Sequence, residues 1–453
     1  MEIREYLDKN LPEMKKALER LVRIPSVSVE KEGDYPFGRE CARVLDEFLA
    51  ICRENGFGSK NYDYYAGSAD FYGNGAEPEL GILAHLDVVP VTEKDWTLPP
   101  YEMTEKDGRL YGRGCMDDKG AVIASLFAMK AVRECGYKLE RNARLIAGCS
   151  EETGSELDLE EYMKRAEMPK AVFTPDAEFP VINIEKGMIR FNFGGNFDCS
   201  VIETVSGGTV VNAVPSEVKA VLKGKVILPE SEGITGSFEN GKTVLICKGK
   251  SAHASTPEQG VNAFTKLFEY LIKTDIGDKD KKMLEALLKL FPNGESNAKA
   301  LDLDVTDESG STTCVFSIID FCGGKLSCKA DMRFPISVTK AKAEEKIRAA
   351  LEKNGLTLFS LTGSEPHCTD KDSDFVKTLL KVYGEVTGKE GYCKAIGGGT
   401  YVHGIEGGVA FGMEAGGEDN HIHGADEWMG IDTFVEAAEI FAKVIVEFCG
   451  GTK

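Results

Sequence analysis

The chain has 453 residues, of which 42% are apolar and 28% charged, the composition of an ordinary globular protein. Its 54 basic and 74 acidic residues give a net charge of −20. Such a field repels nucleic-acid phosphates and anionic lipid surfaces, so we expect neither nucleic acid nor membrane as a partner. The length is too great for one hydrophobic core and predicts two or three domains.

The cellular compartment is indicated by three features. No apolar run approaches the roughly 20 residues needed to span a bilayer. The first 22 residues are charged and place Leu11, Met14, Leu18 and Leu21 on one helical face, which indicates an amphipathic helix and not a targeting signal. The 13 cysteines are scattered without a CxxC pair, as is typical of reduced thiols. We expect a cytoplasmic protein.

The first part of the chain alternates between short apolar runs and helical segments. Residues 81–84 form a buried-strand run that ends at His85, and residues 143–149 and 171–173 are two further strands. Residues 119–135 are rich in helix formers and stop before Gly136. This alternation predicts an α/β fold with a mainly parallel sheet flanked by helices.

The pattern of predicted strands and helices changes after residue 187. Strands are predicted at 218–226 and 243–248, and helices at 262–273, 279–290 and 341–353. A helix follows at 374–388, and Asp432 is a predicted N-cap for a last helix that ends at residue 448. We therefore predict a discontinuous first domain, residues 1–187 and 379–453, with an inserted α+β domain at 188–378.

Acidic and imidazole side chains follow the predicted strands and recur in a late glycine-rich loop. They are His85 and Asp87, Asp117 and Asp118, Glu151 and Glu152, Asp176, and His421 and His423. Each group alone is most simply a solvated turn or a helix cap. The carboxyl ends of parallel strands share one sheet edge, however, and so many carboxylates there are unstable without cations. A pair of divalent ions would resolve this repulsion.

Five motifs, taken in order, carry a resemblance to a known family. They are HLD at 85–87, GRGxxDDKG at 112–120, SEETG at 150–154, TPDAEFP at 174–180 and HxxDE at 423–427. This set resembles the di-zinc metallopeptidases, which include aminoacylases, succinyl-diaminopimelate desuccinylase, glutamate carboxypeptidase and bacterial dipeptidases. TPDAEFP and the long insertion are similar to the PepV-like dipeptidase branch. The resemblance implies a zinc-exopeptidase-like catalytic domain and an inserted lid.

The resemblance also implies which residues bind metal. His85 and Asp176 would bind the first ion, Glu152 and His423 would bind the second, and Asp117 would bridge both. The ions would be two divalent metals, with zinc favoured and manganese or cobalt as alternatives. His423 is preferred to His421 because the family spacing to the following acidic residues fits it.

Other residues near these ligands receive supporting roles from the resemblance. Glu151 would be the general base, Asp87 would orient His85, and Asp118 would be a neighbour of the bridge and not a ligand. Cys115 and Cys149 lie close by in sequence, either as soft ligands or redox sensors or as small packing residues, and we favour packing.

The insert contributes candidate substrate-binding residues. His253, in SAHASTP at 251–257, matches a family signature and would stabilise the oxyanion. Asn212 matches another family motif and would donate a hydrogen bond. Arg333 would hold a substrate carboxylate, or would instead pair with Asp331. Outside the insert, Gly416 offers a backbone amide close to the substrate.

The function implied is that of a metal-dependent dipeptidase. A metal-bridging hydroxide, deprotonated by Glu151, would attack the amide bond of a dipeptide (Xaa-Xaa, including β-Ala-Xaa). The nearest alternative is an N-acyl amino acid deacylase or carboxypeptidase of the same family. An alternative of another class is a non-catalytic metal- or peptide-binding protein. The large insert implies a monomer that acts on a small peptide.

Overall fold

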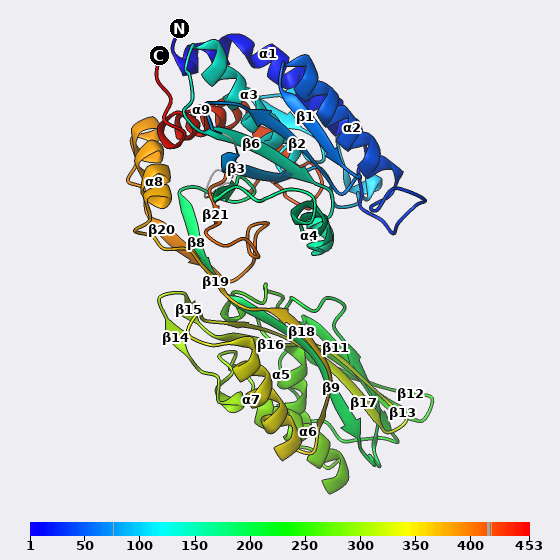
Figure 1. The fold of residues 1–453 in the computed structure, drawn as a ribbon. Helices are drawn as coiled ribbons and strands as arrows, with labels where there is room; N and C mark the ends of the chain where they lie inside the picture. Colours follow the sequence, from blue (N-terminus) through cyan, green and yellow to red (C-terminus); the bar gives the residue numbers. More distant parts are fainter. Residues whose placement is uncertain (76, 415–416, 418) are drawn as a thin grey trace. The chain divides into compact units, whose positions relative to one another are not determined.

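The chain folds into two compact units in the computed structural model, which describes residues 1–75, 77–414, 417 and 419–453 (Figure 1). Unit 1 comprises Met1–Asn183, Thr369–Lys394 and Thr400–Lys453. Unit 2 comprises Ile184–Cys368 and Ala395–Gly399. The insert therefore begins at residue 184 and ends at 368, where the sequence predicted 188 and 378, and it also takes in the short segment 395–399.

The main sheet of unit 1 has the order β1-β2-β6-β3-β7-β21-β8-β19, with β20 paired to β8. The central strands β6, β3, β7 and β21 run parallel, whereas β1, β2 and β8 pair antiparallel with their neighbours. The strands are β1 (Gly58–Tyr62), β2 (Ala66–Phe71), β3 (Pro78–His85), β6 (Asn142–Gly148), β7 (Ala171–Thr174), β8 (Val181–Glu185), β19 (His367–Cys368), β20 (Cys393–Ile396) and β21 (Val409–Ala410).

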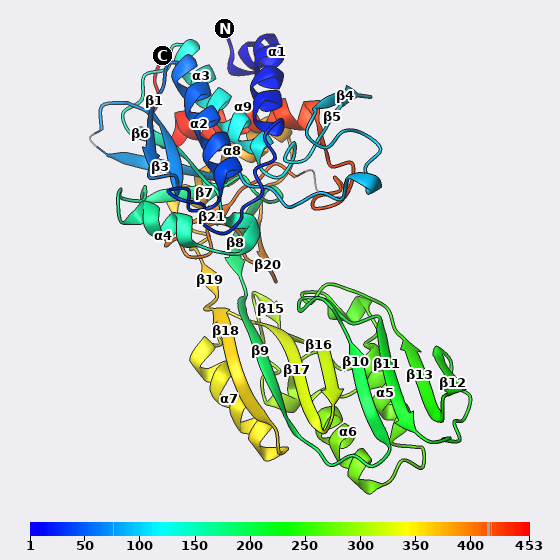
Figure 2. The same ribbon diagram turned by 90° about the vertical axis from the view of Figure 1, so that its right-hand side faces the viewer.

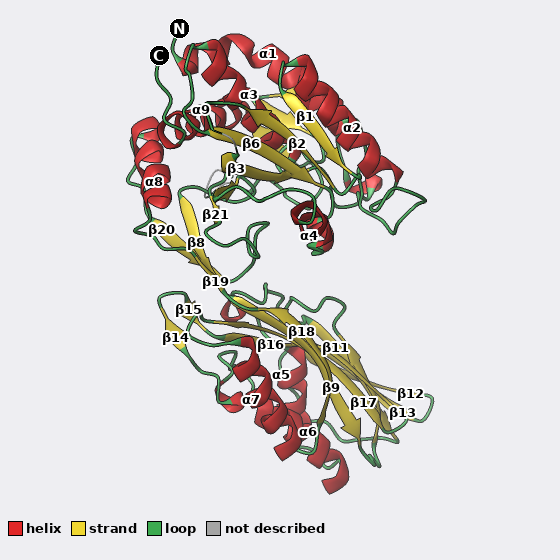
Figure 3. Ribbon diagram, in the orientation of Figure 1, coloured by secondary structure: helices red, strands yellow, loops and turns green. Residues whose placement is uncertain are grey.

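Helices cover both faces of this sheet (Figure 3). Successive side chains of β3 point to opposite faces of the sheet, and both faces are buried under helices. Ile82 and Ala84 join the core beneath the larger helical layer, whereas Leu83 joins a smaller core on the other face. Helix α3 is apolar on nearly all sides and is buried beneath α1 and α9. The helices are α1 (Ile3–Val22), α2 (Arg39–Glu54), α3 (Lys119–Glu134), α4 (Leu157–Met163), α8 (Asp374–Thr387) and α9 (Ile431–Phe448).

Two features of unit 1 differ from the sequence prediction. Helix α9 has Gly430 as its N-cap, so the prediction of Asp432 as the cap is wrong. Asp432 lies inside the first turn, where its carboxylate complements the helix dipole. A small separate sheet joins β4 (Thr104–Lys106), β5 (Arg109–Tyr111) and β22 (Trp428–Gly430), and was not predicted.

Unit 2 is one antiparallel sheet of order β12-β13-β11-β10-β16-β17-β9-β18, with helices on one face (Figure 2). Its core alternates along the strands, as at Ile189, Phe191 and Phe193. Its strands are β9 (Gly187–Asn196), β10 (Ile202–Gly207), β11 (Glu217–Lys223), β12 (Ile234–Glu239), β13 (Lys242–Lys248), β16 (Thr313–Cys322), β17 (Lys325–Phe334) and β18 (Thr357–Ser364), with a short pair β14 (Thr306–Asp307) and β15 (Gly310–Ser311). Its helices are α5 (Ala263–Leu271), α6 (Asp278–Leu290) and α7 (Lys340–Lys353).

The predicted fold class is confirmed: a mainly parallel α/β layer is combined with an inserted α+β unit. Within the described residues, no helix has both the length and the apolar character needed to cross a bilayer.

A buried carboxylate in unit 2 gives a prediction about stability. Asp280 is fully buried, and its carboxylate accepts hydrogen bonds from the backbone of Ser200, Val201 and Ile202. Asp280→Ala leaves these donors unpaired, so urea denaturation should show a free energy of unfolding lower by about 3 kcal/mol. The exposed Asp278, in the same helix turn, is the control; an equal effect of Asp278→Ala would contradict this explanation.

Candidate metal centre

Three neighbouring parallel strands deliver side chains to one edge of the sheet in unit 1. His85 is the last residue of β3, Glu151 and Glu152 lie in the 3-10 turn that follows β6, and Asp176 lies just beyond β7. In the parallel register His85 lies opposite Gly148, the last residue of β6. These side chains therefore gather where parallel sheets bind ligands.

Two further residues reach the same place from outside the main sheet. Asp117 precedes α3 and follows β5, which belongs to the small separate sheet, so it is not at an end of a main-sheet strand. His423 lies in the loop between β21 and β22. The convergence of strand ends predicted from the sequence therefore holds for three of the four acidic motifs.

Asp117 lies between the two imidazoles. Its Oδ1 is 3.0 Å from His85 Nε2, and its Oδ2 is 3.0 Å from His423 Nε2. His423 Nε2 is also 3.0 Å from Glu152 Oε2, and His85 Nε2 is 3.8 Å from Asp176 Oδ2. Each carboxylate oxygen of Asp117 thus faces a different imidazole.

The donor atoms form two groups, each with one imidazole and two carboxylates. One group is His85, Glu151 and Asp176, and the other is Asp117, Glu152 and His423. Within each group one ligand atom per residue lies within 4.8 Å of the others. Glu151 therefore lies close enough to bind the cation of the first group, although the family resemblance implies for it the role of general base.

Asp87 and Asp118 hold the end of β3 in place. His85 Nδ1 lies 3.0 Å from the carbonyl oxygen of Asp87 and 3.4 Å from its carboxylate. Because a carbonyl only accepts, Nδ1 carries a proton, so Nε2 is the ring nitrogen that would bind a metal ion. Asp87 also accepts from the Glu152 N–H at 3.1 Å, and Asp118 accepts from the His85 N–H at 3.1 Å.

The pKa values show how strongly these groups interact. Burial opposes ionisation of Asp117, but hydrogen bonds with His423 and His85 hold the pKa of Asp117 well below its usual range. Hydrogen bonds with Asp117 and Glu152 raise the pKa of His423 to about 10. Burial, with the charges of Asp117 and Glu152, raises the pKa of Glu151 to about 7 against the effect of His85. A cation is strongly favoured at this centre.

The donor set fits a pair of divalent metal ions. Glu152 Oε1 is buried and has no hydrogen-bond partner within the described part of the chain. A carboxylate oxygen that binds a metal ion is expected to lack such a partner when no ion is present. Oxygen and imidazole ligands suit zinc, manganese or cobalt. Cys115 and Cys149 are fully buried and their thiol pKa values are raised well above normal, chiefly by burial for Cys115 and by a hydrogen bond with Cys41 for Cys149. This environment agrees with packing and not with metal binding.

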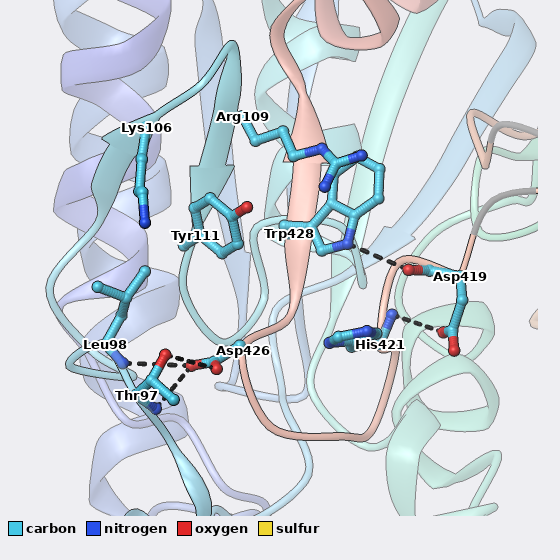
Figure 4. Close-up of a pocket in the computed structure, with 9 residues that line it drawn as sticks. All are labelled: Thr97, Leu98, Lys106, Arg109, Tyr111, Asp419, His421, Asp426 and Trp428. Atoms are coloured by element: carbon cyan, nitrogen blue, oxygen red, sulfur yellow. Dashed lines mark hydrogen bonds between the residues drawn. The ribbon is translucent and has the colours of Figure 1, made fainter.

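His421 belongs to a different place. It lines a neighbouring pocket of about 580 Å³ with Arg109 and Trp428, whose side chains stack (Figure 4). Its Nδ1 donates to the carbonyl oxygen of Ala425 at 3.1 Å. The structure thus brings His423, and not His421, to Asp117.

A supporting pair that the sequence did not reveal lies behind the centre. Asp158 Oδ2 accepts from the Tyr401 hydroxyl at 2.6 Å and from the N–H groups of Cys149 and Ser150, both at 2.9 Å. The ring of Tyr401 meets that of His85 edge to face, with centroids 6.2 Å apart. In the sequence Asp158 is an ordinary first-turn acid of a helix, so no local signal marks it.

His253 and Asn212 lie in unit 2, on two loops that pair with each other. Ala254 N donates to Asn212 O at 2.9 Å, and Ala213 forms a bridge with His253. The Ser255 N–H donates to His253 Nδ1 at 3.2 Å, which leaves the proton on Nε2. Burial, with the nearby charge of Arg333, lowers the pKa of His253, so the ring is a neutral donor at neutral pH.

Arg333 is also in unit 2, and it forms an ion pair with Asp331, which was the alternative to a role in substrate binding. Its Nε and Nη2 bond the two carboxylate oxygens of Asp331 at 2.6 and 3.2 Å, and Nη1 donates to Gly397 O at 3.0 Å. Three of the five guanidinium donors are thereby used. Gly416 lies outside the described residues.

Comparison with known proteins places the chain in a family. The profile of peptidase family M20/M25/M40 matches residues 81–447. The putative dipeptidase YtjP of Bacillus subtilis (strain 168) is 33% identical over 456 residues, covering 95% of this chain and 96% of that protein. The Beta-Ala-Xaa dipeptidase of Lactobacillus delbrueckii subsp. lactis is 32% identical over 455 residues, covering 95% of each. The chain belongs to peptidase family M20/M25/M40, and the predicted metallopeptidase resemblance is confirmed.

The fold is shared with solved structures. The YXEP protein of Bacillus subtilis, described as a dinuclear metal binding peptidase from the M20 family, superposes with a TM-score of 0.56 at 11% identity, covering 98% of this chain and 99% of that one. At this identity the likeness concerns the fold.

The Asp158–Tyr401 pair predicts a pH-dependent effect in the metal-free protein. Burial raises the pKa of Asp158 to about 6 from 3.8, so its folded form holds the proton more tightly and stability falls as pH rises between these values. The Tyr401 hydroxyl bonds the ionised carboxylate most strongly. Tyr401→Phe should therefore lower the free energy of unfolding by about 1.5 kcal/mol above pH 6 and by less at low pH.

Urea denaturation of chelator-treated wild type and Tyr401→Phe at about pH 4.5 and about pH 7.5 measures this difference. Tyr383→Phe, at a buried tyrosine far from Asp158 in sequence, is the control. A Tyr401→Phe effect that is equal at both pH values would contradict the assignment.

Proposed function

We propose that this chain is a metal-dependent dipeptidase that hydrolyses the amide bond of dipeptides, including those with an N-terminal β-Ala residue. The observation that carries the proposal is the division of the Asp117 carboxylate between two ligand groups, with Glu151 beside them. The names of the two relatives that share about a third of its residues support the substrate class.

The ligands that we propose are assigned by their contacts. His85 and Asp176 would hold one ion, Glu152 and His423 would hold the other, and Asp117 would be a ligand shared by both. Zinc is our proposal for both ions, with manganese or cobalt as alternatives that the same oxygen and nitrogen donors accommodate. When bound, such ions polarise the substrate carbonyl and lower the pKa of water.

Glu151 is the proposed general base. In the metal-free protein the pKa of Glu151 is about 7, and nearby divalent cations favour its ionised form. The ionised carboxylate accepts a proton from the attacking water and then passes it to the leaving amine. The backbone of Asp87 fixes the tautomer of His85 during this cycle.

Unit 2 supplies the remaining proposed roles. The neutral His253 donates its Nε2–H to the developing oxyanion, and Asn212 donates a further hydrogen bond. Arg333, held rigid by Asp331, uses its remaining guanidinium donors for the substrate carboxylate. We also propose that the backbone amide of Gly416 contacts the substrate.

The state and location of the protein are also proposals. We propose a monomer, as the family resemblance implies for a chain with so large an insert, here residues 184–368. We propose the cytoplasm, where the 13 free thiols would stay reduced. Sedimentation of the purified protein as a stable dimer would contradict the first of these.

Substituting each of the adjacent glutamates in turn separates catalysis from metal binding. Glu151→Gln removes the proton acceptor but none of the proposed metal ligands, so turnover should fall at least about 10³-fold while metal content stays near wild type. Glu152→Gln, its matched neighbour, should lower the metal content. Steady-state rates and metal analysis by mass spectrometry measure both effects, and substantial turnover by Glu151→Gln would refute the base assignment.

Substrate class and metal dependence are tested together. A panel of Ala-Ala, β-Ala-His, N-acetyl amino acids and tripeptides should show highest kcat/KM for the dipeptides. Activity should disappear with a chelator and return with zinc or manganese. A preference for N-acetyl amino acids would favour a deacylase, and the absence of metal-dependent hydrolysis would favour a binding protein.

A further inference from the structure

The loop that carries His423 is closed at its base and has an unusual backbone. Asn420 Nδ2 donates to Trp428 O at 3.0 Å, and Trp428 N donates to Asn420 O at 3.1 Å. Between them His421, His423 and Asp426 have φ values of 57°, 61° and 56°. This left-handed region is disfavoured for residues other than glycine, so the loop needs contacts from outside to hold its shape.

Glu427 supplies such contacts, and they lead directly to Asp117. Its carboxylate is fully buried and accepts hydrogen bonds from the backbone N–H groups of Gly114, Met116 and Asp117 at 3.0, 2.9 and 3.2 Å. Asp117, a ligand of the second group, therefore donates its own N–H to Glu427. Glu427 belongs to the loop that carries His423, another ligand of the same group.

Arg113 completes this connection from the opposite direction. Its Nη1 donates to Glu427 Oε2 at 2.5 Å, and its Nη2 donates to Gly424 O, next to His423, at 2.9 Å. Both charged groups are buried, with Arg113 2% exposed. The segment 113–117 and the segment 424–427 thus hold each other through a paired buried charge and backbone hydrogen bonds.

The neighbouring carboxylate makes a comparable set of contacts elsewhere. Asp426 accepts from Thr97 N at 2.9 Å, Thr97 Oγ1 at 2.7 Å and Leu98 N at 3.2 Å (Figure 4). These bonds fix the same loop to the segment 97–98 at the rim of the pocket that His421 lines. They do not involve Asp117, which makes Asp426 a matched internal control.

We propose that Glu427 is a positioning residue that sets the separation of Asp117 and His423 and thereby the affinity for the cation held by Asp117, Glu152 and His423. This inference rests on the metal centre of the proposed function. Preorganised ligands bind a cation without first being ordered, so loosening the connection weakens that site more than the site of His85 and Asp176. An amide at this position keeps only one accepting oxygen, so its NH₂ group would face either the backbone N–H groups of segment 114–117 or the Arg113 guanidinium, and in both cases the charge that pairs with Arg113 is lost.

The test is a zinc titration of the chelator-stripped full chain in competition with a chromophoric chelator. Wild type should bind two zinc ions. Glu427→Gln should bind the ion of Asp117, Glu152 and His423 about 10–100-fold more weakly, and the other ion, which shares only Asp117 with it, with a clearly smaller loss of affinity. Asp426→Asn should change neither affinity by more than about 3-fold, since its bonds do not reach a ligand.

Three outcomes would overturn the inference. Glu427→Gln could bind both ions as tightly as wild type, weaken both sites equally, or weaken binding no more than Asp426→Asn. Fewer than two zinc ions on wild type would instead contradict the proposed function itself, so the two failures are distinguishable.

A second variant covers the case in which Glu427→Gln does not fold. Arg113→Lys keeps the buried charge pair but cannot reach both Glu427 and Gly424 O with a fork, so it should weaken the same site about 10-fold. Circular dichroism of the metal-free protein verifies its fold. Unchanged affinity at both sites in Arg113→Lys would overturn the inference.

Discussion

The repulsion among carboxylates gathered at one sheet edge is the constraint on which the rest of unit 1 depends. Asp117, Glu151, Glu152 and Asp176 are drawn together with two imidazoles in a largely buried place. Like charges at such distances are costly when water is excluded. Burial, together with the neighbouring carboxylates, raises the pKa of Glu151, and hydrogen bonds with Asp117 and Glu152 raise that of His423. Bound cations offset this repulsion, so the same cluster of carboxylates that is costly without metal is what binds the metal ions.

The fold maintains this arrangement chiefly through carboxylates that accept backbone N–H groups. Asp87 accepts from Glu152, Asp158 from Cys149 and Ser150, and Glu427 from the segment 114–117. Each of these acids ties the backbone beside a ligand to a separate part of unit 1. A ligand can then be held in place while its own side chain stays available for a cation.

Part of this architecture could be read from the sequence because the signal was local. The apolar run before His85 and the helix that starts at Lys119 are strong periodic patterns, and both elements are present. Helix α2 (Arg39–Glu54) was not predicted, although its buried stripe, with Leu45, Phe48 and Leu49, is amphipathic. The N-cap of α9 was misplaced because Asp432 is a good capping residue by type, whereas the backbone turns one position earlier, at Gly430.

The site could be read only in part, and for a physical reason. Strand ends in a parallel sheet predict that His85, Glu151 and Asp176 are neighbours, but nothing in residue spacing brings Asp117 or His423 to them. The sequence predicts that the Asp117 motif also follows a strand of this sheet, which is wrong, because Asp117 follows β5 of the small separate sheet. Tyr401 and Asp158 act through contacts 243 residues apart, which a single sequence does not encode visibly. Arg333 was rightly weighed against an ion pair with Asp331, and that pair is present.

The most direct test of this account is anomalous diffraction from crystals of the wild-type protein grown with manganese or zinc. The account predicts two peaks that flank the carboxylate of Asp117, one on the side of His85 and Asp176 and one on the side of Glu152 and His423. A single peak, or none at these residues with both ions in excess, would contradict it.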